Sequence, residues 1–333
     1  MEPAVPPSRV VVITGASAGV GRATAIAFAK CGFDVGLIAR GSAGLDGARR
    51  DVEANGQQAI VLPVDVVDAD GVFAAADRVI AEWGRIDVWI NNAMATIFSP
   101  FDEITPDEFK RVTEVTYLGQ VYGTMAALRH MRPRNRGTIV QVGSALSYRA
   151  IPLQSAYCGA KFAVRGFTDS LRSELAHDGS HVRLTMVQLP AVNTPQFDWA
   201  RNRLPKRPQP VPPIYQPETI AREIVRAARD APRELWIGRS ALKAILGTML
   251  LPRLGDRILA TEGYVGQMTR EPAPPDGSGN LFVPASSDAG AHGRFDNRAR
   301  SAVIGFDPIW LRIGMACALF ATIAGIAAMS RSR

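Results

Sequence analysis

A chain of 333 residues with 47% hydrophobic residues can form one large α/β domain with an appendage, and wholesale disorder is excluded. The net charge of +7 is modest and the basic residues are mostly scattered, which argues against nucleic acid as a partner and leaves attraction to a membrane surface open. Three cysteines without CxxC spacing and four histidines without metal-ligand spacing argue against a disulfide framework and predict no metal site.

The chain begins with a loose proline-rich segment, residues 1–8, followed by a predicted strand, a glycine-rich turn and a helix of small residues. Residues 9–13 are β-branched, as in a buried parallel strand, and the predicted helix covers residues 22–30. Glycines between them let the backbone approach a pyrophosphate, which would rest on the helix N-terminus. A glycine-rich turn alone is weak evidence, but this placement predicts a nucleotide site formed by Thr14, Gly15, Ser17, Gly19, Val20 and Gly21.

The second predicted strand, residues 34–39, ends in Ala39 and Arg40. A carboxylate at this strand end would bind the ribose 2′-hydroxyl and reject a 2′-phosphate. Ala39 removes that repulsion, and the Arg40 guanidinium suits a phosphate. We therefore predict NADP(H) rather than NAD(H) as the cofactor, the alternative being that Arg40 is a solvent-exposed loop residue.

Two later strand ends add polar side chains. Asp65 and Val66 follow a predicted strand, and Asp65 either accepts from an adenine amino group or caps the next helix, for which Asp68 is the better candidate. Asn92 and Ala93 follow the next strand, where side-chain amides either tie strands together or line a cofactor groove.

The chain is organised around a stretch that contains Ser144, Tyr157 and Lys161. On a helix, the four-residue spacing of Tyr157 and Lys161 puts both side chains on one face. A neighbouring ammonium lowers the pKa of a phenol toward neutrality, and the Ser144 hydroxyl could hold a carbonyl oxygen while Tyr157 gives or takes the proton. Taken alone, a Tyr and a Lys four residues apart are more often a solvated helix face.

Strands and helices alternate over the first 190 residues. Further helices are expected at residues 45–55, 69–83 and 106–131, and further strands at residues 59–64, 86–90, 138–142 and 182–189. This alternation predicts an α/β fold with a doubly wound parallel sheet covered by helices on both faces.

These stretches together resemble the short-chain dehydrogenase/reductase family over roughly residues 8–240. The matching features, in order, are TGxxxGxG at residues 14–21, Asp65, NNA at residues 91–93, Ser144, YxxxK from Tyr157 to Lys161, and Pro190 followed by Asn193 and Thr194. The resemblance implies a Rossmann-like sheet of about seven strands and a nicotinamide cofactor, to which Pro190, Val192 and Thr194 would also bind. It implies that Tyr157 is the general acid/base, that Ser144 orients the substrate carbonyl, and that Lys161 binds the nicotinamide ribose and lowers the pKa of Tyr157.

The sequence departs from the family pattern at three positions. Met94 follows NNA where glycine is usual, and Ala191 follows Pro190 where glycine is usual. Thr116 stands where the family has a catalytic Asn that is thought to hold a water in the proton relay. Either the Thr116 hydroxyl holds this water in place of the Asn, or the proton relay of this protein differs from that of the family.

Residues 190–217 are rich in proline and are predicted to form a substrate lid within a catalytic domain that spans residues 9–240. The alternative is a plain surface loop. The predicted apolar lining consists of Phe197, Trp199, Leu204, Ile214 and Tyr215, extended by Ile97, Phe98, Leu146 and Tyr148. With no fixed charge partner for an acidic substrate in this region, we expect a lipophilic ketone or secondary alcohol.

The C-terminal third is expected to contain four parts. A helix at residues 218–230 and a strand at residues 234–237 complete the domain, and an apolar helical extension follows at residues 241–270. Residues 271–300 are rich in Pro, Gly, Ser and Asp and are predicted to be a linker. Residues 309–329 are apolar except for Arg312, which predicts a transmembrane anchor, the alternative being a buried or dimer-packing helix.

Three functions are compatible with these features. The first is a membrane-tethered NADP(H)-dependent oxidoreductase whose catalytic domain faces the cytoplasm. The second is a non-catalytic NADP(H)-binding sensor or scaffold at a membrane. The third is a soluble homo-oligomeric reductase in which the tail serves assembly. The set of Ser144, Tyr157 and Lys161 favours an enzyme, and we also expect a homo-oligomer.

Overall fold

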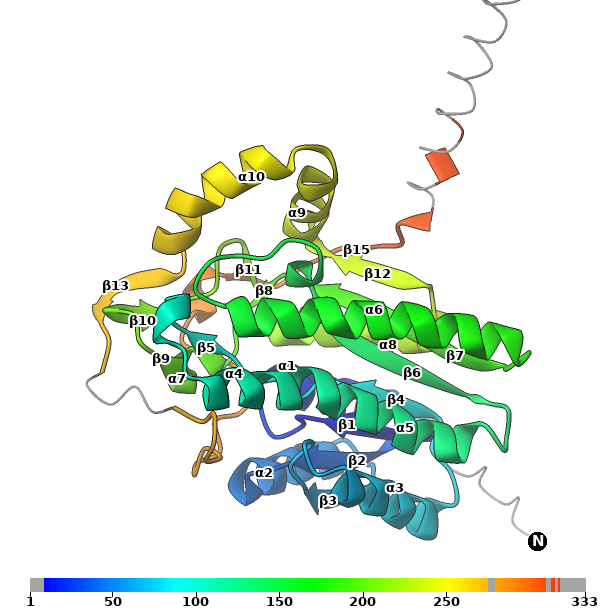
Figure 1. Ribbon diagram of the computed structural model, residues 1–333. Helices are drawn as coiled ribbons and strands as arrows, with labels where there is room; N and C mark the ends of the chain where they lie inside the picture. The colour runs from blue at the N-terminus through cyan, green and yellow to red at the C-terminus, as the bar shows by residue number, and fades with distance from the viewer. Residues whose placement is uncertain (1–8, 275–278, 310–312, 315–316, 318–333) are drawn as a thin grey trace, which may run out of the picture.

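A computed structural model describes residues 9–274, 279–309, 313, 314 and 317 (Figure 1). Its main feature is an eight-stranded sheet with the strand order β15-β12-β7-β6-β4-β1-β2-β3. All neighbours in it are parallel except β15, which pairs antiparallel with β12 at one edge. The prediction of a doubly wound parallel sheet of about seven strands is confirmed, and β15 is an addition that the sequence analysis did not anticipate.

The strands of this sheet are β1 (Arg9–Thr14), β2 (Phe33–Ala39), β3 (Ala59–Pro63), β4 (Val88–Asn91), β6 (Gly137–Ser144), β7 (Val182–Leu189), β12 (Glu234–Ile237) and β15 (Gly305–Phe306). The longer helices are α1 (Gly19–Lys30), α2 (Ser42–Glu53), α3 (Ala69–Trp83), α4 (Pro106–Thr113), α5 (Gly119–Met131), α6 (Ser155–His177), α8 (Pro217–Asp230), α9 (Gly238–Leu250) and α10 (Pro252–Ile258).

Short strands and a short helix form a second layer of structure beyond the C-terminal end of the sheet. They are β5 (Ile97–Phe98), β8 (Ala191–Val192), α7 (Gln196–Trp199), β9 (Arg201–Asn202), β10 (Lys206–Pro208), β11 (Ile214–Tyr215), β13 (Met268–Pro272) and β14 (Ala299–Arg300). They pair as β5 with β9, β10 with β13, and β14-β11-β8.

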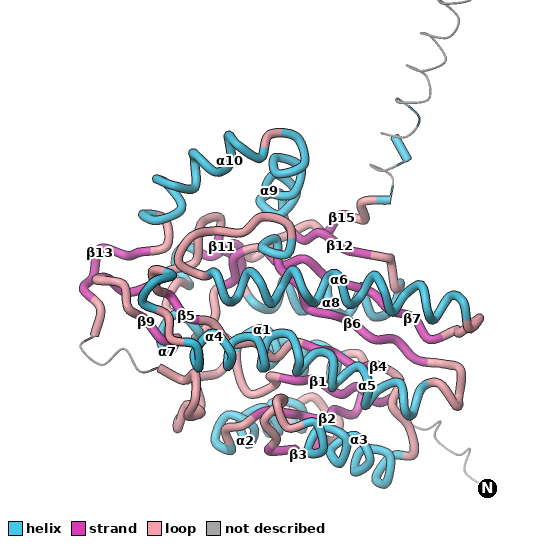
Figure 2. Tube along the Cα trace, in the orientation of Figure 1, coloured by secondary structure: helices cyan, strands magenta, loops and turns pink. Residues whose placement is uncertain are grey.

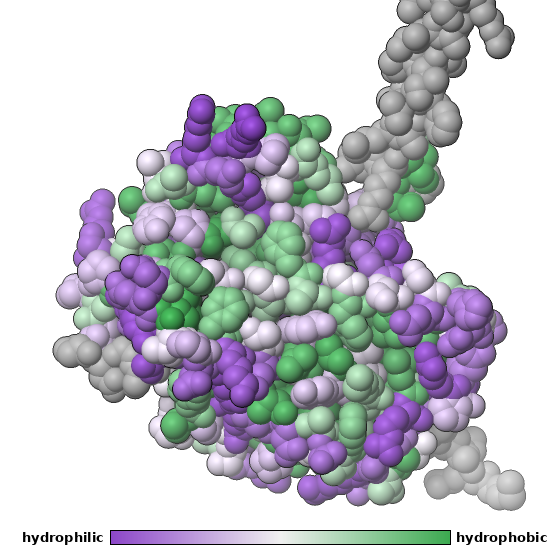
Figure 3. All heavy atoms as spheres, viewed as in Figure 1, coloured by the Kyte–Doolittle hydropathy of each residue, from purple (hydrophilic) through white to green (hydrophobic). Residues whose placement is uncertain are grey.

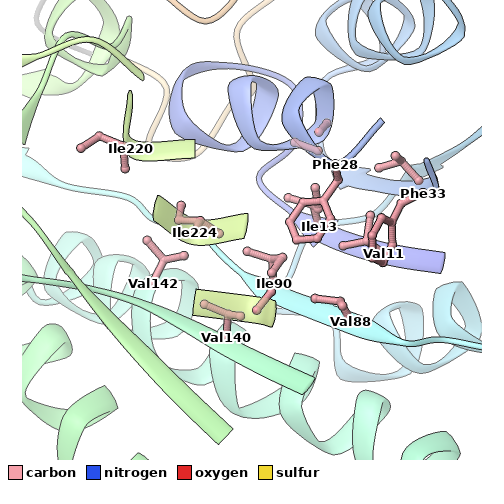
Figure 4. Packing of buried hydrophobic residues seen from close by; sticks show 14 of the residues in the cluster. Val11, Ile13, Phe28, Phe33, Val88, Ile90, Val140, Val142, Ile220 and Ile224 are labelled. Carbon is pink, nitrogen blue, oxygen red and sulfur yellow. The ribbon is translucent and has the colours of Figure 1, made fainter. Parts of the chain in front are cut away.

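Helices cover both faces of the large sheet, as Figures 1 and 2 show. Helices α1, α2 and α8 contribute to the hydrophobic cluster on one face, in which Phe28 packs near Val11 and Ile13, and Ile224 near Val140 (Figure 4). Helices α3 to α6 contribute to the cluster on the other face. Because β1 is buried on both faces, its sequence, RVVVIT, is a nearly continuous run of Val and Ile instead of an alternating pattern.

Element positions follow the sequence predictions closely, with small shifts at the ends. The structure has α3, β7 and β12 with the predicted bounds. The predicted helix at residues 106–131 is continuous but contains a π-helical segment, Glu114–Leu118, between α4 and α5. Such a segment adds a residue to one turn and changes where the side chains around Thr116 point.

The prediction of a linker at residues 271–300 is wrong. Leu281 and Phe295 in this segment are 1% and 4% exposed, and its last residues form β14. We call residues 279–300 the strap, because they run across the C-terminal end of the sheet before the chain returns to form β15 (Figure 1). Composition indicated a linker because it does not report contacts with distant segments, such as the hydrogen bonds from Arg40 to strap carbonyls and the pairing of Asp288 with Arg22.

The predicted anchor, residues 309–329, falls almost entirely outside the described residues. Within the described part of the chain, no helix is both long and apolar enough to cross a bilayer.

Candidate active site

The glycine-rich turn between β1 and α1 has the close backbone approaches that its sequence predicts. Gly15 has φ +69°, and a Cβ there would lie 2.9 Å from the Cα of Ala93. A Cβ on Gly21 would lie 2.1 Å from the Gly15 carbonyl oxygen, so the helix can begin this close to the turn only with glycine. The N-cap residue Ala18 makes no side-chain cap, which leaves the helix N-terminus to be satisfied by other groups.

Side chains at the ends of β1 and β4 fix the backbone beside this turn. The Thr14 hydroxyl accepts from the N–H groups of Asn92 and Ala93, both at 3.0 Å. The Asn92 amide donates to the Thr14 carbonyl at 3.0 Å, whereas Asn91 donates to Thr124 at 2.9 Å and so ties β4 to α5. Asn91 thus ties β4 to its neighbours, and Asn92 ties the end of β4 to the glycine-rich turn.

Arg40 lies where β2 ends, as predicted, but its guanidinium already has protein partners. It donates to the backbone carbonyls of Asn280, Leu281 and Phe282 in the strap, at 2.6, 3.3 and 3.0 Å. Burial lowers the pKa of Arg40 and Asp65 opposes that shift. Arg40 is partly buried and held by these bonds, so the alternative that it is a solvent-exposed loop residue is wrong.

Asp65 lies beside Arg40 at the end of β3. Its carboxylate pairs with Arg111 and accepts from the N–H of Val67 at 3.3 Å. Asp68, and not Asp65, caps α3 by accepting from Gly71 at 3.0 Å. Asp65 thus stays on the wall of the groove described below.

Ser144, Tyr157 and Lys161 lie close together at the C-terminal end of β6, next to the end of β4. Ser144 is the last residue of β6, and Tyr157 and Lys161 lie one turn apart in α6. A hydrogen bond joins Tyr157 and Ser144, and the Lys161 Nζ lies 5.6 Å from the centre of the Tyr157 ring. Lys161 is 1% exposed and donates to the Val142 carbonyl at 2.6 Å. The alternative of a solvated helix face is excluded.

Burial shifts the pKa of both titratable groups toward their neutral forms. It raises the pKa of Tyr157, an effect that the hydrogen bond with Ser144 reduces. Burial also lowers the pKa of Lys161 to about 7. Among the protein groups alone, the pKa of Tyr157 is therefore raised, contrary to the predicted lowering by Lys161, and the group that does lower it is Ser144.

A buried polar network holds the backbone of Ser144. Its N–H donates to the Gln188 amide oxygen at 2.9 Å, and the Gln188 amide nitrogen donates to Glu234 at 2.7 Å. The Tyr148 hydroxyl also donates to Glu234, at 2.7 and 2.8 Å to its two oxygens. This network connects β6, β7 and β12 and fixes the end of β6 where Ser144 lies.

Most of the predicted site residues border one groove with a cavity volume of about 540 Å³. Of the predicted cofactor and catalytic residues, the groove is lined by Gly15, Ser17, Gly19, Val20, Arg40, Asp65, Val66, Asn92, Ala93, Ser144, Tyr157, Lys161, Pro190, Val192 and Thr194. Thr14 and Gly21 do not line the groove, but they position residues that do, through the contacts described above.

The predicted substrate lining is only partly correct. Phe197, Trp199 and Leu146 line the groove. Six other predicted lining residues are buried in hydrophobic clusters instead, namely Ile97, Phe98, Tyr148, Leu204, Ile214 and Tyr215. Sequence identifies apolar residues in the segment, but the fold decides which of them face the groove and which face the core.

A buried ion cluster anchors the segment at residues 190–217 to α4. Glu108 is 2% exposed and accepts from both terminal nitrogens of Arg203 at 2.7 Å, and Arg201 also pairs with it. Burial alone would raise the pKa of Glu108, but the hydrogen bonds from Arg203 and Thr105 and the charges of both arginines lower it to about 2. The segment is thus fastened at its middle.

Thr116, at the position of the family's catalytic Asn, makes two backbone contacts. Its hydroxyl accepts from the N–H of Ala95 at 3.0 Å and donates to the carbonyl of Ala95 at 2.9 Å. A hydroxyl has one donor, which this contact uses. Thr116 is fully buried in the π-helical segment.

Several groove residues were not anticipated. They come from the loop after Ser144, from the α9 to α10 region and from the strap, and include Arg149, Gln154, Ser240, Ala241, Ala244, Ile258, Leu259, Asn280, Pro284, Ala285, Ser287 and Ala289. Arg149 pairs with Asp256 at 2.7 Å, so this cation on the wall has a protein counter-ion. The apolar character of residues 241–251 was the one signal that could have placed α9 here.

The geometry agrees with comparisons to known proteins. The family model for short chain dehydrogenases matches residues 9–203. The chain is 34% identical to the uncharacterized oxidoreductase YxnA of Bacillus subtilis over 292 residues. This match covers 87% of this chain and 81% of that protein. A metagenomic short-chain oxidoreductase in complex with NADP is 27% identical with a TM-score of 0.56, covering 66% of this chain and 90% of the other. A short chain dehydrogenase from Mycobacterium paratuberculosis bound to NAD is 26% identical with a TM-score of 0.57, over the same shares.

The chain belongs to the short-chain dehydrogenase family. It is an oxidoreductase of that type with the family's Rossmann-like fold, and its structural neighbours bind nicotinamide cofactors of both kinds.

Proposed function

We propose that this protein is an NADP(H)-dependent oxidoreductase that interconverts a lipophilic ketone and a secondary alcohol. The observation that carries the proposal is that Ser144, Tyr157 and Lys161 line one groove with the glycine-rich turn and with apolar side chains such as Leu146, Phe197 and Trp199. A binding module would not need a phenol, a hydroxyl and a buried amine at one point of that groove.

The proposed roles follow from the protein's own groups. The Ser144 hydroxyl donates to the substrate carbonyl oxygen, and Tyr157 donates the proton to that oxygen as the carbonyl is reduced. A bound nicotinamide supplies the hydride. The raised pKa keeps Tyr157 protonated, as a general acid requires for reduction of the carbonyl. The protonated form of Lys161 would stabilise the phenolate that remains after this proton is given up, and the same phenolate accepts the alcohol proton in the reverse direction.

Two groups support NADP(H) as the cofactor. Ala39 offers no carboxylate to repel a 2′-phosphate, and the partly buried Arg40 lines the groove at that strand end. Only three of the five guanidinium N–H groups are needed for its three bonds to the strap. The same guanidinium can therefore hold the strap and donate to a phosphate.

The activity is tested by following NADPH and NADH oxidation over a panel of lipophilic ketones and aldehydes. Tyr157→Phe removes only the hydroxyl and should reduce turnover by at least about 10²-fold, the size of general-acid effects, while the dissociation constant for NADPH changes little. Cys158→Ser, at the next position of α6, is the matched control and should keep turnover. Equal turnover by Tyr157→Phe and the wild type would refute the catalytic role of Tyr157.

The panel also separates the enzyme from the alternative function. If the protein binds NADPH but turns over neither ketones nor, in reverse, lipophilic alcohols, the non-catalytic sensor or scaffold is favoured. Robust turnover of only small charged substrates would overturn the lipophilic substrate class.

Cofactor preference is tested with Arg40→Asp. Loss of a charge-assisted contact to the 2′-phosphate should raise the Kd for NADPH by about tenfold more than the Kd for NADH, because the loss of the three bonds to the strap acts on both cofactors alike. An unchanged ratio of the two Kd values would contradict the role of Arg40 in phosphate binding.

The membrane anchor at residues 309–329 is a proposal that rests on sequence. Exposed apolar residues on α9 and α10 and between them support it, with Met249, Leu250, Leu251 and Leu254 all at least half exposed, and Figure 3 shows hydrophobic atoms over this region beside strongly hydrophilic ones. Deletion of residues 309–333 leaves β15 intact and should abolish carbonate-resistant membrane association. Association that survives the deletion would refute the anchor.

A further inference from the structure

We propose that the strap, residues 279–300, is part of the cofactor site and covers the adenosine and phosphate half of the groove, so that it controls how tightly the nicotinamide cofactor is held and how fast it leaves. This inference rests on the proposed function. It assigns binding residues outside residues 9–203, the part of the chain that matches the family model.

Strand pairing fixes the last residues of the strap and a stretch of the chain that precedes it. Before it, β13 pairs antiparallel with β10, and its last two residues form β14, which pairs parallel with β11. Inside it, Leu281 is 1% exposed in the cluster that contains Ile38 and Val66, and the Phe295 ring packs 5.9 Å from that of Phe197. The strap is therefore an integral part of the packed domain.

Its first turn is held by two arginines at the adenosine end of the groove. Arg40 donates to three consecutive strap carbonyls, and Arg111 donates to the carbonyl of Leu281 at 3.1 Å. Arg111 also pairs with Asp65, the proposed adenine contact. The groups expected to recognise the adenosine ribose and base are thus the same groups that hold the strap.

Its middle is held over the glycine-rich turn. Asp288 pairs with Arg22 at 3.0 Å, and Arg22 also donates to the carbonyl of Ser17 at 3.3 Å and pairs with Asp51 at 2.6 Å. The Gly19 N–H at the start of α1 donates to the strap carbonyl of Gly290 at 3.0 Å. The strap therefore contacts the phosphate-binding turn directly at Gly19 and indirectly through Arg22.

The side chains that the strap turns toward the groove are small or uncharged, namely Asn280, Pro284, Ala285, Ser287 and Ala289. Asp288 stands between Ser287 and Ala289 but faces Arg22 instead of the groove. A carboxylate facing the groove would repel phosphates, and large side chains would fill it. The space of about 540 Å³ stays open beneath the strap, so its side chains form a wall and do not occupy the site.

The test measures cofactor binding and not turnover. Two variants loosen the strap at separate points, Asp288→Ala at its middle and Leu281→Ala at its first turn. Asp178→Ala is the matched control, because Asp178 pairs with Arg132 at 3.4 Å beyond the C-terminus of α6, at the opposite end of the sheet. Circular dichroism and thermal unfolding establish that each variant is folded.

NADPH and NADH dissociation constants come from fluorescence titration, and release rates come from stopped-flow displacement. We expect Asp288→Ala and Leu281→Ala to raise the Kd for both cofactors by about tenfold, mainly through faster release, and Asp178→Ala to change neither. NADPH should also slow amide hydrogen exchange in residues 279–300 of the wild type.

Each outcome decides between readings. If the wild type binds cofactor and both strap variants release it at the wild-type rate, the strap has no part in the site and the proposed function stands. If the strap variants bind more tightly, the strap blocks the site and our inference is wrong. If the wild type binds neither NADPH nor NADH, the proposed function fails and the inference fails with it.

Discussion

Replacing Glu108 by Gln keeps the size of the side chain and removes the charge that fastens the segment at residues 190–217 to α4. Glu108 is 2% exposed, whereas its partners Arg201 and Arg203 have side chains that are 27% and 25% exposed. Breaking a buried ion pair costs about 3–5 kcal/mol, and the partial exposure of the arginines favours the lower end. We expect Glu108→Gln to lower the free energy of unfolding by about 3 kcal/mol.

The effect should depend on pH in a defined direction. The pKa of Glu108 is lowered to about 2, against an ordinary value of 4.5, so the folded state binds this proton less readily than the unfolded state. The stabilisation is therefore fully present above pH 4.5 and is lost as pH falls toward 2. The difference between wild type and variant should shrink over that range.

Urea unfolding at pH 7 and at pH 3 measures both quantities. Glu114→Gln is the matched control from the adjoining helical turn, because Glu114 pairs with Lys110 at 3.7 Å on the surface and should change stability by less than about 0.5 kcal/mol. A loss below 1 kcal/mol at pH 7 for Glu108→Gln, or a difference that does not shrink with acid, would refute the reasoning. Since the fastened segment carries Phe197 and Trp199, the variant should also raise KM for lipophilic substrates more than it lowers kcat.

Two further predictions concern buried polar groups beside the groove. Thr116→Val leaves the N–H and carbonyl of Ala95 without their partner, so it should lower the free energy of unfolding in urea by about 1–3 kcal/mol. The kcat of this variant should stay within about threefold of the wild-type value. A large loss of kcat at unchanged stability would instead give Thr116 the relay role. Burial lowers the pKa of Lys161 to about 7, so between pH 7 and pH 9 this amine stays protonated only in the unfolded chain, and the wild type should become more stable as the pH rises. Lys161→Met should remove this gain in stability. Equal slopes of unfolding free energy against pH for both proteins would contradict the lowered pKa.

Much of the site could be predicted because its chemistry is local in sequence. The spacing of Tyr157 and Lys161 on one helix, and the glycines at positions 15 and 21, are set by backbone geometry within a few residues. The same holds for β7 and β12, whose apolar runs gave their bounds. Local patterns of this kind need no knowledge of distant segments.

The residues that face the groove from the C-terminal third could not be predicted in this way. Leu204 and Tyr215 have the same apolar character as Trp199, and only packing decides that the first two are buried in the core while the third lines the groove. The partners of Arg40 lie some 240 residues away and are backbone carbonyls, which every residue carries and no composition reveals.

By itself, then, the sequence determined the parallel sheet, the glycine-rich turn and the positions of Ser144, Tyr157 and Lys161, because periodicity and short-range spacing specify them. Only the tertiary structure decided that Thr116 is tied to Ala95 and that residues 279–300, which lie in a stretch predicted to be a linker, are a strap over the groove. Both depend on contacts between segments far apart in the chain, and such contacts are fixed by how the whole domain packs and not by the residues nearby.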